Sequence, residues 1–416
     1  MRHDRPPNRR QDAGAPSIAK QNHDQSGRGL PHSKADVRFM RLALRLSRRG
    51  LGLTSPNPMV GAVLVQRGKI IGRGWHQRAG EPHAEIEALR DAARRGASCR
   101  GATLYITLEP CSTHGRTPPC TDALIAAGIA RVVVAATDPN PKHAGRGFRI
   151  LRAAGIQVDS GLLADAAARL NESFHHWIVH RVPFVTVKSA MTLDGKIATA
   201  SGESKWITGE PARDEGMKLR QGADAILVGV NTVLADNPKL TFRSRTSEVE
   251  SQKVGRLRRI ILDSKARTPL TAKVVTDEFA SLTTIVVTKM APARRVAALA
   301  KRVEVWIAPG RGSALRGAGP LPGANRVDLR LLLKKLGREN VTNLLVEGGG
   351  EVNAAFLLGG FAQRVTFFYA PKILGGRDAR KAVAGLGARR LADALTLRDI
   401  EWRRVGDDWM MTARLG

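Results

Sequence analysis

Apolar and polar positions alternate along the chain in runs that predict strands and helices. Apolar residues at helical spacing predict a first helix with Asp36 as its N-cap. A buried strand over 60–65, a turn at Arg67-Gly68 and a returning strand over 69–75 follow. The other elements predicted for this half are a helix over 83–95, a strand over 104–107, a helical run over 123–127, a strand over 131–136 and a helix over 162–179. This order predicts a sheet covered by helices.

The pattern restarts after Pro183, where alternation over 184–190 predicts a strand. Pro211 predicts the start of a helix over 211–221, because proline is favoured at the first helical position. Further strands are predicted over 225–229, 258–263, 283–287, 303–307, 343–346, 364–369 and 409–415. Strands and helices alternate, so the second half is also α/β. The prediction is a polar, disordered basic tail over 1–34, a domain over 35–180 and a domain over 181–416.

Gly348-Gly349-Gly350 joins the strand over 343–346 to a helix that runs through Leu358. A strand, a glycine turn and a helix start let backbone N–H groups approach a phosphate, and the helix dipole favours its charge. Tight strand-to-helix turns also use glycine for steric reasons alone. Both interpretations of this turn stay open from the sequence.

The composition narrows the class of protein. The chain has 416 residues, enough for two or three domains, and its formal net charge is +30. It has no long basic block and few aromatic residues for base stacking. We therefore expect no nucleic-acid partner, and we interpret the charge as an Arg-rich surface with a secondary contribution from phosphate ligands. Three cysteines exclude a disulfide scaffold and favour a reducing, cytoplasmic compartment. No apolar run suits a membrane span or a signal peptide, so no membrane partner is expected.

The strongest chemical signal is one imidazole and two thiols. His83 is followed two residues later by Glu85, and Cys111 follows Pro110. Zn²⁺ takes His nitrogen and Cys sulfur, and a catalytic site keeps three protein ligands and one open position. If the metal-held hydroxide attacks an aminated ring carbon, the reaction also needs a proton shuttle beside the metal, because the amine must leave as ammonia. His83, Cys111 and Cys120 therefore predict a catalytic zinc site, with Glu85 as the acid and base.

The spacing of this signal can be compared with a known pattern. His-x-Glu followed by Pro-Cys-x-x-Cys is the signature of zinc nucleobase deaminases. In this chain the second cysteine, Cys120, comes nine residues after Cys111. The intervening segment 112–119 is rich in turn residues, so it can fold out and return Cys120 to the metal. Cys120 also begins a predicted helix, whose dipole stabilises a thiolate.

With motifs of the second half, these residues resemble the bifunctional riboflavin-biosynthesis deaminase–reductase family of bacteria. The matching segments are Thr54 to Gly61, His83 to Glu85, Glu109 to Cys111, Gly115 to Cys120, Lys188 to Gly195, Gly202 to Thr208, Asn231 to Arg243 and Glu347 to Gly349. These segments follow one another in family order, and the resemblance covers about residues 36–416. The resemblance implies a cytidine-deaminase-like three-layer domain followed by a dihydrofolate-reductase-like α/β domain, and it suggests a homodimer.

The resemblance also implies a reaction for each domain. The first would remove the 2-amino group of 2,5-diamino-6-(5-phosphoribosylamino)pyrimidin-4-one. The second would use NADPH to reduce the ribosyl side chain of the product to ribityl. In the deaminase it implies that His83, Cys111 and Cys120 hold Zn²⁺, that Glu85 shuttles protons and that Asn57 lies along the pocket.

For the reductase, the resemblance implies one set of cofactor contacts and one set of substrate contacts. NADPH would contact Ala190, Trp206, Thr232, Asp236, Ser264, Gly349, Gly350, Glu351, Val352, Asn353, Ala354 and Ala355. The substrate would contact Ser204, Arg220, Leu240, Arg243 and Glu347. The planar forks of Arg220 and Arg243 suit the ribose phosphate, although an arginine is more often a solvated surface charge.

One position departs from the family pattern, which commonly has histidine directly after Cys-Ser. Thr113 holds that place and His114 follows it. If the family histidine contacts the substrate, either His114 replaces it through a shifted loop, or the contact with the substrate is lost.

Two other functions stay open at this point. A nucleic-acid base deaminase, acting on tRNA or single-stranded DNA through a fused binding domain, is motivated by His-x-Glu and the basic charge. The long gap between Cys111 and Cys120 and the complete second domain argue against it. A zinc-stabilised binding module without activity would have a closed site with four protein ligands.

Overall fold

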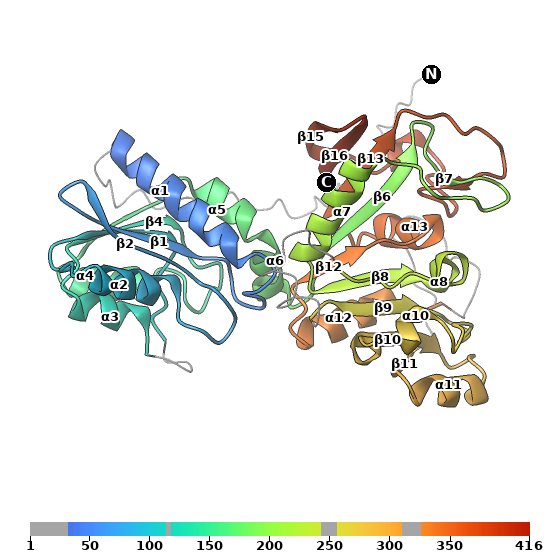
Figure 1. Cartoon of the computed structure of the whole chain (residues 1–416), viewed down its shortest axis with the longest axis horizontal. Coiled ribbons are helices and arrows are strands. Elements are labelled where there is room, and N and C mark those ends of the chain that lie inside the picture. The colour runs from blue at the N-terminus through green and yellow to red at the C-terminus, as the bar shows by residue number, and fades with distance from the viewer. Residues whose placement is uncertain (1–31, 114–117, 243–255, 310–325) are drawn as a thin grey trace, which may run out of the picture.

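The computed structural model describes residues 32–113, 118–242, 256–309 and 326–416 (Figure 1). Two α/β units lie side by side, and helix α6 (Glu172–His180) lies between them. The tail predicted over 1–34 lies outside the described residues up to position 31. Its end belongs to α1 (Lys34–Ser47), whose N-cap is Ser33. Asp36, predicted as the N-cap, is instead the third helical residue, because its carboxylate closes a capping box by accepting the Ser33 N–H at 2.9 Å.

The first sheet has five strands in the order β2-β1-β3-β4-β5. They are β1 (Gly61–Gln66), β2 (Lys69–Trp75), β3 (Thr103–Leu108), β4 (Arg131–Ala136) and β5 (Gln157–Ser160). β1 is antiparallel to β2 and β3, whereas β3, β4 and β5 run parallel. α1, which η1 (Arg48–Gly50) follows, packs on one face with α5 (Ala164–Leu170). α2 (Ala84–Arg94), α3 (Cys120–Ala126) and α4 (Arg146–Ala153) cover the other face (Figure 1).

The helix predicted over 162–179 is wrong as a single element, because it breaks at Asn171 into α5 and α6. The Asn171 side chain accepts the Met59 N–H at 2.8 Å and donates to the Met59 carbonyl at 2.9 Å. A pairing across more than a hundred residues therefore overrides the local helical pattern. α4 and β5 were not predicted, and only the two central residues of β5 are buried.

The second sheet has nine strands in the order β11-β10-β9-β8-β12-β6-β13-β16-β15. They are β6 (Phe184–Thr192), β8 (Ala225–Gly229), β9 (Arg258–Leu262), β10 (Thr283–Thr288), β11 (Glu304–Ala308), β12 (Asn343–Val346), β13 (Arg364–Ala370), β15 (Leu397–Val405) and β16 (Asp408–Leu415). The strands from β11 to β13 run parallel, and β16 and β15 complete the sheet as antiparallel neighbours. β7 (Lys196–Ala198) and β14 (Arg380–Lys381) form a separate two-stranded sheet.

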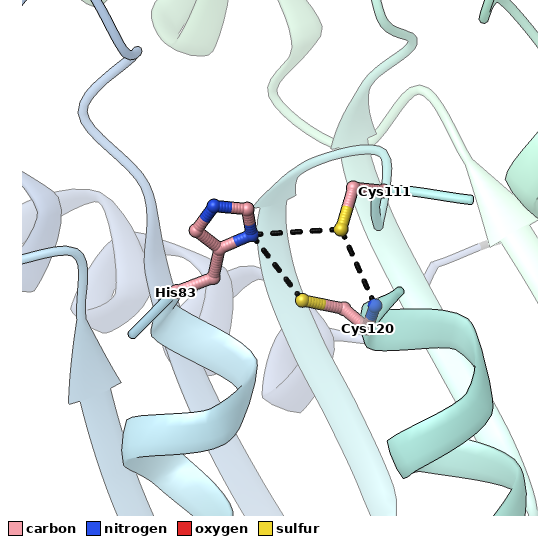
Figure 2. Close-up of side chains that lie close together, drawn as sticks. All are labelled: His83, Cys111 and Cys120. Atoms are coloured by element: carbon pink, nitrogen blue, oxygen red, sulfur yellow. Dashed lines mark hydrogen bonds between the residues drawn. The ribbon is translucent and has the colours of Figure 1, made fainter. Parts of the chain in front are cut away.

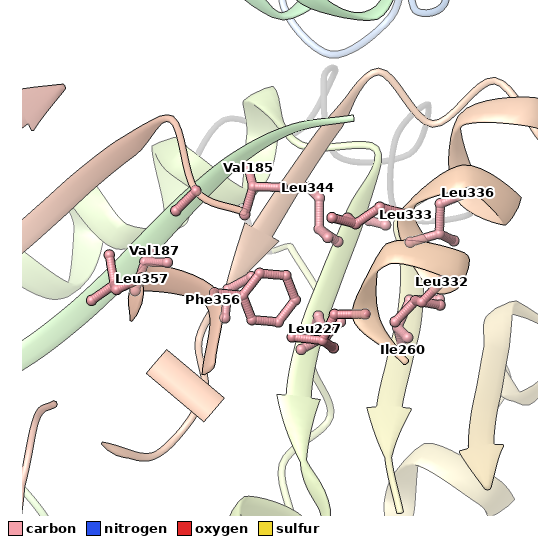
Figure 3. Packing of buried hydrophobic residues seen from close by; sticks show 14 of the residues in the cluster. Val185, Val187, Leu227, Ile260, Leu332, Leu333, Leu336, Leu344, Phe356 and Leu357 are labelled. Atoms are coloured by element: carbon pink, nitrogen blue, oxygen red, sulfur yellow. The ribbon is translucent and has the colours of Figure 1, made fainter. Parts of the chain in front are cut away.

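Helices cover both faces of this sheet. α12 (Leu329–Arg338) and α13 (Gly350–Leu358) pack leucine and phenylalanine side chains against β6, β8, β9 and β12 (Figure 3). On the other face lie α7 (Glu210–Gly222), α8 (Val230–Asp236), α10 (Lys273–Thr276) and α11 (Ala293–Ala300), with η2 (Ala280–Leu282) nearby in sequence. η3 (Leu391–Asp393) lies in the segment before β15.

Two details of this half differ from the sequence expectation. Pro211 is the second residue of α7 rather than the first, because the helix already begins at Glu210. β15 was not predicted, because nearly all of its residues are exposed and it lacks a buried alternating face. In the part of the chain that the structure describes, no helix has the length and apolar character needed to cross a bilayer.

Helix α6 joins the two units by specific contacts. The indole N–H of Trp177 donates to the Gly337 carbonyl at the end of α12, at 2.8 Å. Glu172 forms ion pairs with Arg364 of β13 and Arg414 of β16. Side chains of the first unit therefore lie directly against the edge of the second.

Candidate active sites

The three predicted zinc ligands converge from three different elements. His83 is the N-cap of α2, Cys111 follows β3 and Cys120 is the first residue of α3. The His83 Nδ1 atom lies 3.5 Å from the Cys111 sulfur and 3.4 Å from the Cys120 sulfur (Figure 2). Bond lengths of tetrahedral zinc give an N-to-S ligand edge of about 3.6 Å, so the donor set fits this ion. Among the described residues, these three are the one group of three or more potential ligands.

The two cysteines lie side by side although they are nine residues apart in the sequence, as the zinc prediction requires. The backbone N–H of Cys120 donates to the Cys111 sulfur at 3.2 Å, and the N–H of Thr121 donates to the Cys111 carbonyl at 3.3 Å. Residues 114–117, which include His114, lie outside the described part of the chain. Hydrogen bonding from the Cys120 thiol lowers the pKa of Cys111, and His83 adds to this effect. The site therefore carries a thiolate ready for a cation.

Glu85, the predicted proton shuttle, lies next to the ligand cluster. It lies in the first turn of α2, only 3% exposed, with its carboxyl group beside both cysteine sulfurs. Burial, and then the charge of Cys111, raise the pKa of Glu85 to about 7. A carboxyl group with this pKa can both take up and release a proton near neutral pH.

His76, which the sequence did not single out, orients Asn57. The Asn57 Nδ2 atom lies 3.2 Å from His76 Nε2, and His76 Nδ1 lies 3.1 Å from the Pro82 carbonyl. These two contacts require the tautomer that donates from Nδ1 to the Pro82 carbonyl and accepts from Asn57 at Nε2, and burial lowers the pKa of His76, which also favours the neutral ring. This leaves the Asn57 carbonyl oxygen as an acceptor. The sequence offered only a histidine directly after the strand over 69–75; its edge-to-face packing against His83, with ring centroids 5.3 Å apart, is decided by the fold.

A cavity of about 1270 Å³ lies along the carboxyl ends of β8 and β9 and the start of α13. Of the predicted cofactor and substrate residues, it is lined by Ser204, Thr232, Asp236, Ser264, Gly349, Gly350, Glu351, Val352 and Ala355. Ala190, Trp206, Asn353 and Ala354 do not line it. Asn353 is buried and donates to the Ala382 carbonyl, whereas Trp206 is 66% exposed beneath the guanidinium of Arg213.

The glycine turn before α13 has a steric role at two positions. A Cβ on Gly348 would lie 2.5 Å from the Val352 Cβ, and one on Gly350 would lie 2.3 Å from the Lys381 carbonyl. Gly349 has no neighbour within 4 Å of such an atom, and it lines the cavity. Close packing therefore explains two of the glycines, and phosphate binding at Gly349 stays a prediction.

Two predicted substrate residues bind each other. The Arg220 guanidinium donates to both Glu347 oxygens, at 2.9 and 2.8 Å, and to the Thr241 carbonyl at 2.9 Å. Burial raises the pKa of Glu347, but Arg220 and then Lys188 outweigh it and lower that pKa to about 2. Lys188 belongs to a matching family segment, but the sequence analysis gave it no role. The structure places its charge close enough to Glu347 to lower the pKa of that residue.

The other two predicted substrate residues are less informative. Leu240 is buried with a positive φ of 53°, and Arg243 lies outside the described residues.

Comparison with known proteins places this geometry in a family. Residues 183–411 match the family model of the RibD C-terminal domain, and residues 33–136 match that of the cytidine and deoxycytidylate deaminase zinc-binding region. The riboflavin biosynthesis protein RibD of Aquifex aeolicus is 44% identical over 373 residues, which is 90% of this chain and 96% of that protein. RibD of Escherichia coli is 40% identical over 379 residues, 90% of this chain and 97% of that protein. The chain belongs to the RibD family.

Solved RibD structures have the same fold. RibD of Acinetobacter baumannii superposes with a TM-score of 0.78 at 35% identity, over 92% of this chain and 99% of that one. A Thermotoga maritima deaminase/reductase gives a TM-score of 0.74 at 33% identity, with the same coverage. The predicted fold class is confirmed: a cytidine-deaminase-like domain precedes a RibD reductase domain.

As a RibD protein, the chain is a bifunctional deaminase and reductase of riboflavin biosynthesis. The alternative of a nucleic-acid base deaminase is not favoured, because the second domain is the RibD reductase domain rather than a nucleic-acid-binding module.

Proposed function

We propose that the domain over 35–180 hydrolyses the 2-amino group of 2,5-diamino-6-(5-phosphoribosylamino)pyrimidin-4-one, and that the domain over 181–416 reduces the product with NADPH. The Thermotoga maritima relative is named a diaminohydroxyphosphoribosylaminopyrimidine deaminase/5-amino-6-(5-phosphoribosylamino)uracil reductase, which supports this substrate. The observation that carries the deaminase assignment is the three-ligand cluster of His83, Cys111 and Cys120 beside the buried Glu85.

In the deaminase, the ligand cluster would hold Zn²⁺, which supplies the Lewis acidity that makes water nucleophilic at neutral pH. Glu85 takes a proton from the attacking water and gives it to the departing amine, so that ammonia leaves. The Asn57 carbonyl oxygen accepts a hydrogen bond from the ring substituents, held in place by His76. In this mechanism the metal activates water, Glu85 transfers the proton and Asn57 positions the substrate.

In the reductase, the cavity beside α13 would hold NADPH, whose nicotinamide supplies the hydride. The predicted cofactor contacts are proposed for all of the residues first assigned to NADPH. These are the residues that line the cavity, Thr232, Asp236, Ser264, Gly349, Gly350, Glu351, Val352 and Ala355, and those that do not, Ala190, Trp206, Asn353 and Ala354. Arg220, Glu347 and Lys188 form a buried charged group next to β6 and β12, and we assign them to the phosphoribosyl part of the substrate. Ser204, Leu240 and Arg243 complete the proposed substrate contacts.

The variant Glu85→Gln tests the deaminase assignment. It should retain stoichiometric zinc and unchanged stability, lose at least about a hundredfold in deamination, and keep NADPH-dependent reduction of the deaminated intermediate. Products would be followed by mass spectrometry with and without NADPH. Glu87→Gln on the same helix, where Glu87 pairs with Arg90, is the matched control and should deaminate normally. Normal turnover by Glu85→Gln would disprove the proton-shuttle role, and four protein ligands with no turnover would favour the binding module.

We also propose that the enzyme is a cytoplasmic homodimer. The free cysteines suit a reducing compartment. β15 is an edge strand of the large sheet, and it exposes Ile400 and Trp402, the latter by 57%. An exposed edge with apolar side chains favours pairing with a second copy across a two-fold axis.

A further inference from the structure

A second cavity, of about 480 Å³, lies over the open edge of the smaller sheet. The edge strand is β2, the last in the order of this sheet, and α1 and α2 cover opposite faces (Figure 1). Side chains of all three elements line the cavity, so it lies between the two helical layers. No predicted zinc ligand, cofactor contact or substrate contact is among its lining residues. A cavity of this volume suits a small organic ligand.

One wall of this cavity is apolar. Leu42 and Leu46 lie one turn apart on α1 and face it together, and the half-buried Trp75 of β2 packs in the same cluster. The Arg49 guanidinium, from η1 directly after α1, lies over the Trp75 ring with its Cζ atom 4.8 Å from the ring centroid. Leucine side chains beside a stacked indole offer contacts to a planar ring that a phosphate group alone cannot use.

The two carboxylates that line the cavity are already paired. A Glu87 oxygen lies 2.9 Å from Arg90 Nη1. Asp91 lies 3.5 Å from Arg94 Nη2 and 2.9 Å from Arg95 Nε, so two arginines share its single charge. The cavity therefore has no free acid to attract a cationic ligand.

Arg49 and Arg73 give the cavity an uncompensated positive charge. Both side chains are exposed, and neither has a described carboxylate within ion-pair distance. The Arg73 backbone N–H donates to the Asp91 carboxylate at 2.9 Å, which caps the edge of β2 at this point against pairing with another strand. A guanidinium can bind phosphate through two parallel N–H groups. Two unpaired arginines beside an apolar wall therefore suit a phosphate ester with a ring attached.

We propose that this cavity binds the phosphate monoester of a planar heterocycle. Arg49 and Arg73 hold the phosphate, and the ring lies along the apolar wall. No catalytic group of either proposed reaction lines the cavity, so the ligand binds there without being converted. It contacts the helix that begins at the deaminase site, because residues of α2 form part of the cavity. The inference goes beyond both proposed reactions and does not depend on them.

Nucleotides and flavin phosphates share this chemistry, and calorimetric titration of the full-length, zinc-loaded protein distinguishes them. The probes are 5′-AMP, flavin mononucleotide, their unphosphorylated forms adenosine and riboflavin, and ribose 5-phosphate. NADPH is present in excess, so that the proposed cofactor cavity is filled. At least one phosphate ester should bind at least about tenfold more tightly than its unphosphorylated form and than ribose 5-phosphate, which lacks the ring. In Arg49→Gln/Arg73→Gln, the Kd of that ester should rise at least about tenfold.

Arg38→Gln/Arg41→Gln is the matched control, because it removes two exposed charges from α1 outside the cavity. It should leave the Kd within about twofold. Failure of wild type to bind either ester, an unchanged Kd in Arg49→Gln/Arg73→Gln, or equal losses in both double variants would overturn the inference. Equal affinity of wild type for the ester and for ribose 5-phosphate would overturn the part assigned to the ring. None of these results bears on the deaminase and reductase assignments.

Discussion

At the scale of single residues, the proposed zinc site depends on a carboxylate outside its set of predicted ligands. Glu109 lies two residues before Cys111 and is buried. Its oxygens accept the backbone N–H groups of Asp138, Gly145 and Gly147 at 2.9 to 3.1 Å. It thereby ties the segment that carries the metal ligand to the loop before α4.

Replacing this carboxylate should weaken the fold of the first domain. In Glu109→Gln the amide nitrogen replaces one acceptor oxygen, so at least one of the three buried or partly buried N–H groups loses its acceptor. We expect a loss of about 1–3 kcal/mol in the free energy of unfolding, measured by urea denaturation. Glu81→Gln, in a surface pair with Arg78 whose side chains are 45% and 33% exposed, should change it by less than about 0.5 kcal/mol. Equal effects in both variants would argue against the anchoring role.

Glu347 makes stability depend on pH at the reductase site. Its pKa of about 2 in the folded protein lies below the ordinary value of 4.5. A lowered carboxyl pKa stabilises the fold fully above the unfolded-state pKa, and this stabilisation is lost as the pH falls towards the folded-state value.

Wild type should therefore lose more stability between pH 5 and pH 3 than Glu347→Gln, by a few kcal/mol as an order of magnitude. At pH 7 the variant should be less stable, because Arg220 stays buried without its partner. Urea titrations at several pH values measure both effects. Glu401→Gln, at an exposed glutamate of β15, should keep the wild-type profile. Parallel profiles for wild type and Glu347→Gln would contradict the role of Glu347.

At the scale of elements, α2 carries both His83 and Glu85, so the way it packs on β2 sets the geometry of the deaminase site. Glycines on β2 let the helix approach closely. A Cβ on Gly74 would lie 2.3 Å from the Ala84 carbonyl and 2.4 Å from the Ala88 nitrogen. The same applies to Gly72, whose Cβ would lie 2.3 Å from the Ala88 carbonyl.

The variant Gly74→Ala should therefore displace the first turn of α2. We expect a loss of about 1–3 kcal/mol in stability from overpacking, together with weaker retention of zinc against a chelator. Calorimetry and metal analysis after dialysis measure the two effects. Gly222→Ala is the control, since its Cβ would meet Leu51 at an ordinary 3.6 Å. Full zinc retention in Gly74→Ala would show that the helix position is not limiting.

At the scale of the whole molecule, one helix connects the two units, and the large sheet ends in two edge strands of different character. α6 connects the units through Trp177 and Glu172. The edge at β15 exposes apolar side chains, whereas the opposite edge, β11, is a strand of five residues.

The proposed homodimer gives a prediction at this scale. Wild type should sediment at twice the mass of the chain, and Trp402→Glu should sediment as a monomer, because the charge would be buried unpaired at the contact. Ile307→Glu on β11, where Ile307 is similarly exposed, should stay dimeric. A monomeric wild type, or a dimer that tolerates Trp402→Glu, would rule out pairing through β15.

The sequence by itself determined what local patterns encode. Strands such as 69–75, 131–136, 225–229 and 343–346 were predicted with their observed bounds, because their apolar patterns read directly as buried strands. The chemistry of His83, Glu85, Cys111 and Cys120 was readable because the types of ligand and their order already limit the metal.

Only the tertiary structure decided how distant side chains pair. Asn171 breaks a helix because Met59 lies beside it, and Arg220 binds Glu347 because α7 packs near the end of β12. Asn57 is oriented by His76, and the residues that follow β8 and β9 meet the start of α13 only around the cavity. Local hydrophobic spacing does not tell which strands become neighbours. The pairing of distant side chains therefore depends on the order of the strands within each sheet.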